Sequence, residues 1–148
     1  MTKYVTLRAD TLMGMFHRLP QALRAQALAA LADSTFEHGG DSARRTLEGG
    51  AGSAQALLEK IEQTAAELGW GTWRFGERSA TRLALEVSGS PFAEGYGAGL
   101  DPVCAPVTGM LRAVAELVLG GACEAREIEC RACGAAACRF EAILGSQP

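Results

Sequence analysis

The sequence predicts an α+β fold, an antiparallel sheet with helices packed on one side, and three observations predict it. Apolar side chains recur at the spacing of one helix face through residues 54–68. The period changes to two across residues 72–87, as expected for a hairpin of two strands. A second helical pattern at residues 107–118 precedes two more strand-like stretches, so the C-terminal half has the order β-β-α-β-β.

The size and charge of the chain limit what it can be. Its 148 residues, with a mass of 15.5 kDa, are enough for one core, so we expect a single domain over residues 1–148. The 14 basic and 17 acidic side chains offer no basic surface for nucleic acid. The sequence has no run of about 18 apolar residues and no signal-peptide core. These features predict a cytoplasmic protein that neither binds nucleic acid nor spans a membrane.

The N-terminal third is expected to contain short elements. Residues 4–7 alternate like a short edge strand, and a helix is expected over residues 10–17. An alanine- and leucine-rich helix should follow over residues 21–37. The Gly39-Gly40 pair is expected to stop it, so that residues 41–47 form a separate short helix.

The middle of the chain carries clearer signals. Ser53 is a suitable N-cap for the helix at residues 54–68, and Gly69 is the residue expected just after its end. The glycine- and proline-rich residues 88–100 are expected to form a long irregular loop. Pro106 fits the first turn of the next helix. After it, strands are expected at residues 123–131 and 137–143, joined by a tight loop.

All five cysteines fall between positions 104 and 138. Cys130 and Cys138 bracket a Gly/Ala-rich segment that can turn back on itself, and Cys104 opens the helical stretch before it. Three thiols brought together suit a soft ion with tetrahedral geometry, and zinc is the first candidate. In a reducing compartment, an odd number of crowded cysteines favours metal ligands over disulfides. The alternative is that the cysteines are small apolar residues of the core.

The C-terminal half resembles the 4-vinyl reductase domain family. This family includes the sensory domains of bacterial activators that detect phenol- and toluene-type aromatics, and a protein of bacteriochlorophyll biosynthesis. The resemblance rests on Gly109-Met110-Leu111 after Cys104, followed by Glu127-x2-Cys130-x3-Gly134-x3-Cys138-x-Phe140. It implies a closed structural zinc site with four protein ligands: Cys104, Glu127, Cys130 and Cys138. A closed site of this kind is not set up for hydrolysis.

The implied ligand set leaves one alternative open and makes one structural demand. Cys133 could replace Glu127 and give an all-cysteine site, whereas Cys123 has no counterpart among the family's ligands. Glu127 and Cys130 are three residues apart, which in a regular strand places them on opposite faces. The proposed site therefore requires a β-bulge or the end of the strand between them.

Most aromatic residues gather in and after the predicted hairpin. Aromatic rings with a few polar tips typically line small-molecule pockets, and the glycines of the following loop could let it close as a lid. The expected pocket residues are Trp70, Trp73, Phe75, Phe92 and Tyr96. The alternative is that these rings form the core between sheet and helices. Phenol sensors of the family use a histidine and a tryptophan on the hydroxyl group, and the sequence does not establish whether His17 or His38 corresponds to that histidine.

We therefore expect a stand-alone small-molecule-binding domain, a sensor or a carrier, for an apolar or aromatic ligand. The alternative implied by the resemblance is an enzyme or accessory subunit of tetrapyrrole metabolism. Reducing a vinyl group needs an electron donor, and the sequence has neither a dinucleotide fingerprint nor a cysteine set typical of an iron–sulfur cluster. We therefore favour binding over catalysis. A third alternative is an interaction module similar to the vesicle-tethering subunits that share the fold. The family also implies a homodimer, for which the helix from Gln21 offers a flat surface.

Overall fold

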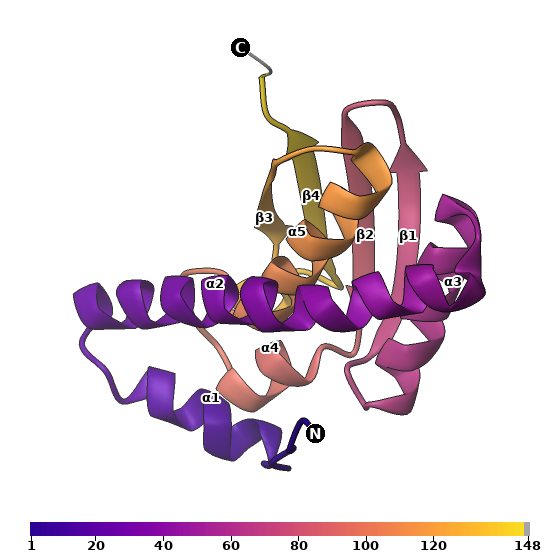
Figure 1. Ribbon diagram of the computed structural model, residues 1–148. Coiled ribbons are helices and arrows are strands. Elements are labelled where there is room, and N and C mark those ends of the chain that lie inside the picture. Colours follow the sequence, from indigo (N-terminus) through magenta and orange to yellow (C-terminus); the bar gives the residue numbers. More distant parts are fainter. Residues whose placement is uncertain (147–148) are drawn as a thin grey trace.

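The computed structural model describes residues 1–146, in which three helices are followed by two strands, two further helices and two further strands (Figure 1). The helices are α1 (Ala9–His17), α2 (Gln21–Thr46), α3 (Ala54–Glu67), α4 (Pro91–Tyr96) and α5 (Ala105–Leu119). The strands are β1 (Thr72–Arg78), β2 (Arg82–Ser88), β3 (Cys123–Glu129) and β4 (Cys138–Leu144). A π-helical turn, Leu47–Ala51, follows α2, and a 3-10 turn, Arg131–Cys133, joins β3 to β4.

The four strands form one antiparallel sheet with the order β1-β2-β4-β3. The last strand lies inside the sheet, where Phe140 of β4 pairs with Leu85 of β2 on one side and with Glu127 of β3 on the other. The helix α5 packs against β2, β3 and β4, and α2 lies across α5 (Figure 1). The predicted α+β class, with helices on one side of an antiparallel sheet, is confirmed.

The core lies between the sheet and α5. Every second residue of β2 points inward, and Leu83 and Val87 are completely buried there. Val107 and Leu111 of α5 are equally buried, one turn apart on the face that meets the sheet. This alternation and this helical stripe are the two periods that predicted the fold.

The helix α2 is continuous from Gln21 to Thr46, so the predicted stop at Gly39-Gly40 and the separate helix over residues 41–47 are wrong. The glycines face α5. A Cβ on Gly39 would overlap the sulfur of Met110, and one on Gly40 would lie 3.5 Å from the Cβ of Ala113. The contact between the two helices offsets the helix propensity lost at glycine, so here glycine permits close packing and does not break the helix.

Two other predictions for the chain path are wrong. Residues 4–7 form no strand, and Tyr4 and Val5 are 86% and 85% exposed, because among the described residues no sheet edge pairs with them. Residues 88–100 are not wholly irregular, since they contain the short helix α4. Gly95 allows α4 to lie against the backbone of α1, where a Cβ would come within 2.7 Å of the Ala9 carbonyl.

The expected caps of α3 are present. The hydroxyl oxygen of Ser53 accepts a hydrogen bond from the N–H of Ala56 at 3.1 Å, which satisfies one free donor of the first turn. Gly69, just after the helix, has a φ of 76°. Glycine adopts this left-handed conformation without strain, which explains why the helix ends there.

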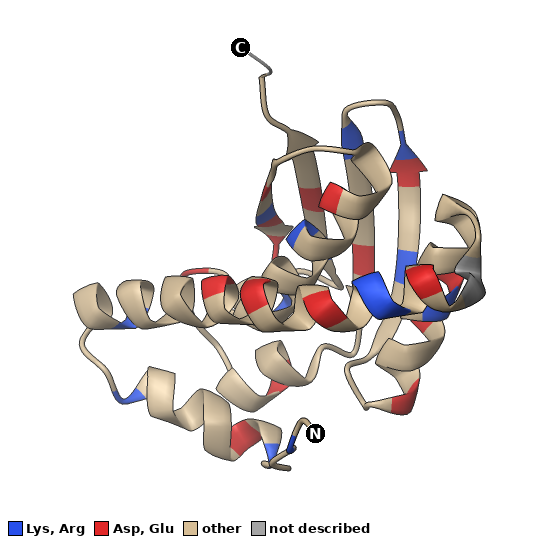
Figure 2. Ribbon diagram, in the orientation of Figure 1, with Lys and Arg blue, Asp and Glu red and all other residues tan. Residues whose placement is uncertain are grey.

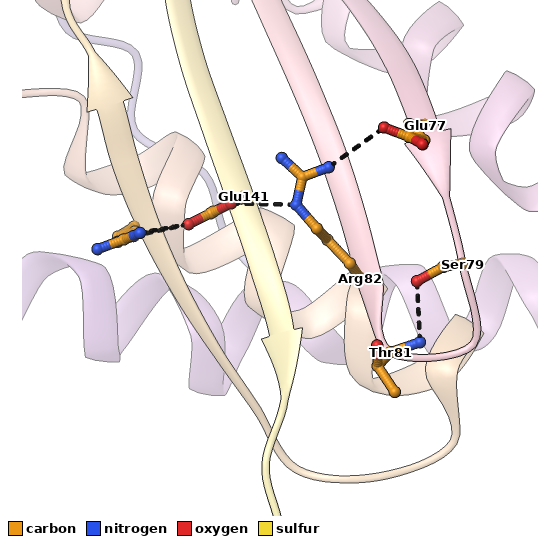
Figure 3. A network of polar contacts seen from close by, with 6 residues as sticks. Glu77, Ser79, Thr81, Arg82 and Glu141 are labelled. Atoms are coloured by element: carbon orange, nitrogen blue, oxygen red, sulfur yellow. Dashed lines mark hydrogen bonds and ion pairs between the residues drawn. The ribbon is translucent and has the colours of Figure 1, made fainter.

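The outer face of the sheet carries paired charges. Glu141 of β4 lies between two arginines, and Arg82 reaches from it to Glu77 (Figure 3). The hydrogen bond from Arg126, together with that from Arg82, lowers the pKa of Glu141. Acidic and basic residues are interspersed over helices and strands alike (Figure 2). Within residues 1–146, no helix has the length and apolar character needed to cross a bilayer.

Candidate metal centre

The four residues implied as metal ligands come together at one end of the sheet. Cys104 is the N-cap of α5, Glu127 lies near the end of β3, Cys130 begins the turn after it, and Cys138 opens β4. Their ligand atoms all lie within 4.8 Å of one another, a spacing at which a single ion could be held. Residues 34 positions apart thus meet because the hairpin folds back against the start of α5.

A β-bulge brings Glu127 and Cys130 to the same side of the strand. Glu127 pairs with Phe140 and Glu129 pairs with Arg139, so the register shifts by one residue between them. The extra residue in the bulge shifts the alternation, so the side chains that follow it point to the opposite face of the sheet from the one a regular strand would give. The structural demand made by the three-residue spacing is therefore met.

The turn between the two hairpin cysteines is closed by backbone hydrogen bonds. The carbonyl of Cys130 accepts from the N–H groups of Cys133 at 3.0 Å and Ala135 at 3.2 Å. Gly134 adopts a φ of 98°, which only glycine takes without strain. The turn also directs the N–H of Arg131 at the sulfur of Cys138, 3.4 Å away. Such a donor stabilises a thiolate at this position.

The carboxylate of Glu127 is satisfied on one side only. Its Oε1 accepts a hydrogen bond from the backbone N–H of Cys104 at 3.0 Å. Its Oε2 is buried and has no hydrogen-bond partner. Burial, followed by the negative charge of Cys130, raises the pKa of Glu127 to about 8. A buried acceptor without a donor is costly, and a cation at this position would remove that cost.

The three sulfurs are linked to one another. Cys104 Sγ lies 3.7 Å from Cys138 Sγ, and each of the three thiols is only 1% exposed. Hydrogen bonds from Cys104 and then Cys138 lower the pKa of Cys130, while the same contact raises the pKa of Cys104. The group can thus share protons when no metal is bound, and a dication would replace them. Three sulfurs and one carboxylate oxygen are donors that suit zinc.

The other two cysteines lie outside this cluster. Cys133 is exposed on the turn, and the cluster of possible ligands contains Glu127 in its place. The thiol of Cys123 is buried 3.4 Å from the carbonyl oxygen of Gly121. The geometry therefore favours the ligand set with Glu127 over the all-cysteine alternative.

The five aromatic residues expected to line a pocket are divided between two places. Trp70 contacts Phe92 edge to face, with ring centroids 5.0 Å apart, and lies 6.3 Å from Trp73. Trp73 in turn lies 6.2 Å from Phe75. These four rings pack against one another beside α3 and the sheet, an arrangement that also suits a core. Tyr96 lies apart from them, and its ring is 4.8 Å from that of His17 on α1.

A cavity of about 490 Å³ lies between α1, α2, α4 and residues 98–103, and Tyr96 is the only one of the five aromatics that lines it. Its walls include two groups that the sequence did not indicate, His17 and Arg24. Arg24 is already engaged, because its guanidinium donates to the carbonyl oxygens of Phe16 at 2.9 Å and Leu19 at 2.8 Å. No sequence signal could have found this site, since its walls come from three helices that only the tertiary structure brings together.

The fold and the cluster together define the class of this protein: a small α+β domain whose C-terminal hairpin and central helix converge on one candidate metal site. Residues 83–144 match the family model of the 4-vinyl reductase domain. The predicted resemblance to this family is thus confirmed for these residues, which include all four cluster side chains.

Three solved structures share the fold. The phenol-responsive sensory domain of the transcription activator PoxR, solved with phenol, has a TM-score of 0.79 and 18% identity, covering 97% of this chain and 77% of that chain. A vinyl-4-reductase family protein from Methanocaldococcus jannaschii has a TM-score of 0.59 and 14% sequence identity, covering 93% of this chain and 91% of that chain. A trafficking protein particle complex subunit 3 from Naegleria fowleri, covalently bound to palmitic acid, has a TM-score of 0.64 and 15% sequence identity, covering 93% of this chain and 95% of that chain. No curated protein matches the chain.

Proposed function

We propose that this protein is a small-molecule-binding domain, a sensor or carrier for an apolar or aromatic ligand, with a structural zinc site. The observation that carries this proposal is the shared fold with the PoxR sensory domain over almost the whole chain. The four ligands of the zinc would be Cys104, Glu127, Cys130 and Cys138.

The role proposed for zinc is to hold the C-terminal hairpin against α5. Four protein ligands leave no open position for water or substrate, which is typical of structural sites. The unpartnered oxygen of Glu127 and the three buried thiols support this assignment, because they gain a common partner when the ion is present. A reducing, cytoplasmic setting would keep these thiols available.

The ligand would lie against the aromatic residues Trp70, Trp73, Phe75, Phe92 and Tyr96. Of these five, Tyr96 lines the cavity, whereas the other four rings pack against one another. The cavity volume falls within the range of about 300–1,000 Å³ usual for small-molecule sites. His17, whose ring lies against Tyr96, offers a polar atom for a hydroxyl group of the ligand.

Native mass spectrometry of the purified protein tests both parts of this proposal. We expect a mass excess of one zinc in the wild type, absent from Cys138→Ala. The matched control is Cys133→Ala, which removes an exposed thiol outside the cluster and should keep the metal. Any further excess would give the mass of a bound ligand. A metal-free wild type prepared under reducing conditions would overturn the zinc assignment.

The alternative, an accessory subunit or enzyme of tetrapyrrole metabolism, is supported by the shared fold with a vinyl-4-reductase family protein. A visible absorption band in the purified protein would favour it, whereas binding of simple phenols without colour would favour sensing.

The homodimer remains part of the proposal. Met15 of α1 and Leu23 of α2 are both 52% exposed, and a second copy could cover them. Sedimentation of wild type and Leu23→Glu would test this interface. A dimer lost in the variant supports it, and a monomeric wild type contradicts it.

A further inference from the structure

Ser90 is the one buried polar side chain that touches the cluster without belonging to it, within the part of the chain that the structure describes. It is 0% exposed and lies 14 residues before Cys104, at the N-terminus of α4. Its Oγ is 3.1 Å from Cys104 Sγ, and it also accepts a hydrogen bond from the N–H of Ala93 at 3.4 Å. One hydroxyl group therefore contacts both the candidate metal ligand and the helix that borders the cavity.

The direction of the sulfur contact follows from the chemistry of the groups. A hydroxyl has one proton to donate and two lone pairs that accept. The N–H of Ala93 uses a lone pair, so the proton is free for the sulfur of Cys104. A thiolate that binds a metal has no proton of its own, so in the loaded site Ser90 must be the donor.

The negative charge of the cluster makes a hydrogen-bond donor at Cys104 favourable. Three thiolates and one carboxylate carry four negative charges, of which a dication neutralises two. Two further donors already face the cluster, the N–H of Arg131 toward Cys138 and the N–H of Cys104 toward Glu127. Ser90 supplies the corresponding donor to Cys104 from outside the ligand set. Donors of this kind orient the metal ligands and spread their charge.

The segment that begins at Ser90 is attached to the metal centre at a second point. The N–H of Gly99 donates to the carbonyl of Ala132 at 2.8 Å, within the turn that joins Cys130 to Cys138. Between these two attachments lie α4 and the start of the loop after it, which supply Tyr96 and Ala98 to the cavity wall, and residues 99–103 continue that wall. The chain then runs directly into Cys104.

We propose that Ser90 is a positioning residue for Cys104, and that through it metal binding orders α4 and the cavity wall. This inference rests on the proposed metal site and adds a link from that site to the cavity. Cys104, held by a bound metal, would keep its sulfur in place for the hydroxyl of Ser90, and that hydroxyl would hold the first turn of α4. The cavity wall would then be more ordered with the metal bound than without it.

The test compares Ser90→Ala with Ser53→Ala in the full chain. Both changes remove a serine N-cap, from α4 and α3 respectively, but Ser53 lies far along the chain from the cysteines and caps only Ala56. Zinc affinity is measured by competition with a chromophoric chelator. We expect Ser90→Ala to bind zinc about 10-fold more weakly, as is common when an outer hydrogen-bond donor is lost. Ser53→Ala should bind zinc as the wild type does.

Hydrogen–deuterium exchange at saturating zinc gives a second readout. In the wild type and in Ser53→Ala, zinc should slow exchange in both residues 91–99 and the hairpin 123–144. In Ser90→Ala, zinc should still protect the hairpin and Gly99, whose N–H donates to the carbonyl of Ala132 in the hairpin turn, but should no longer protect residues 91–96. Ser90→Gly serves as a further variant, because glycine is tolerated at an N-cap and keeps α4 while removing the sulfur donor. It should behave as Ser90→Ala does.

The outcomes separate this inference from the proposed function. If Ser90→Ala and Ser90→Gly bind zinc with wild-type affinity and keep the protection of residues 91–96, the role of Ser90 is wrong while the metal site stands. If Ser53→Ala shows the same loss as Ser90→Ala, the effect is one of general stability and the inference also fails. If the wild type binds no zinc, both the metal site and the role of Ser90 are overturned.

Discussion

The backbone N–H of Cys104 donates a hydrogen bond to the carboxylate of Glu127 at 3.0 Å, and this bond joins the start of α5 to the end of β3 without the help of a metal. The same carboxylate keeps its other oxygen buried without a partner. Glu127 is therefore both a structural bridge and the least satisfied group of the cluster. Its protonation should affect the stability of the metal-free protein.

We expect the metal-free protein to lose stability as the pH rises, through Glu127. The folded-state pKa of about 8 lies above the ordinary value of 4.5, so the folded protein holds this proton over a window in which the unfolded chain has lost it. The contribution is complete below about pH 4.5 and is lost as the pH rises to about 8. Glu127→Gln keeps the acceptor for Cys104 and removes the titration.

Denaturant unfolding at pH 5 and pH 8, with chelator and reductant present, measures this contribution. Relative to Glu127→Gln, the wild type should lose on the order of 1–3 kcal/mol of unfolding free energy between the two pH values. Because the charge of Glu127 is coupled to those of the neighbouring cysteines, the difference between the two proteins reports the titration of Glu127 together with this coupling. Equal pH dependence in the two proteins would show that Glu127 is ionised already at pH 5.

Removing the metal should loosen the C-terminal hairpin. In the zinc-loaded wild type, a strong chelator should lower the melting temperature and speed amide exchange in β3 and β4, because these strands lose their link to α5. Cys104→Ala, which cannot form the full site, should give the same melting temperature with and without chelator. If the chelator leaves the melting temperature of the wild type unchanged, a structural role for the metal is contradicted.

Gly109 is expected to be essential to the packing of α5 on α2. A Cβ at this position would overlap the carbonyl oxygen of Ala32 and come within 2.9 Å of the Cβ of Thr35. Gly109→Ala should therefore destabilise the protein by about 2 kcal/mol or more, since rigid backbone has to move. Chemical denaturation measures the loss.

The matched control is Gly49→Ala, at a glycine whose added Cβ would have nothing within 4 Å. This change should be neutral or stabilise the protein by about 0.5 kcal/mol, because alanine restricts the unfolded chain. If both variants lose the same stability, the cause is not the contact between α2 and α5.

Introducing a bulky side chain on the α2 wall of the cavity should block ligand binding. Ala25 lines the cavity, so Ala25→Trp should weaken the binding of phenol, measured by calorimetry, about tenfold or more. Ala22→Trp places the same ring on α2 outside the cavity lining and should leave the affinity unchanged. Equal phenol binding by both variants would argue that the ligand sits among the packed rings near Trp70 instead.

Much of the fold could be predicted from local signals. The stripe of apolar residues in α3, its cap at Ser53 and the glycine after its end appear in the structure as expected. The alternation that predicted β1 and β2 is the alternation of buried and exposed residues. These features are read correctly from sequence because each depends on residues only a few positions apart.

The elements that were predicted wrongly depend on distant neighbours. Gly39-Gly40 resembles a helix stop, yet α2 continues because those glycines receive Met110 and Ala113 of α5. Residues 4–7 have the composition of a strand but pair with no other strand within residues 1–146. In both cases the secondary structure depends on the segments that pack against these residues, and local propensity carries no information about those segments.

The sequence by itself determined the periods of the helices and strands and the clustering of the cysteines, and its resemblance to the 4-vinyl reductase domain implied the four side chains that meet near the hairpin. Only the tertiary structure decided how they meet, through the bulge before Glu129 and the turn at Gly134. It alone also placed Ser90 beside Cys104, and His17 beside Tyr96 at the cavity. The physical reason is the separation of the interacting residues along the chain. Periodicity depends on neighbouring residues, whereas a binding site forms where distant segments pack together.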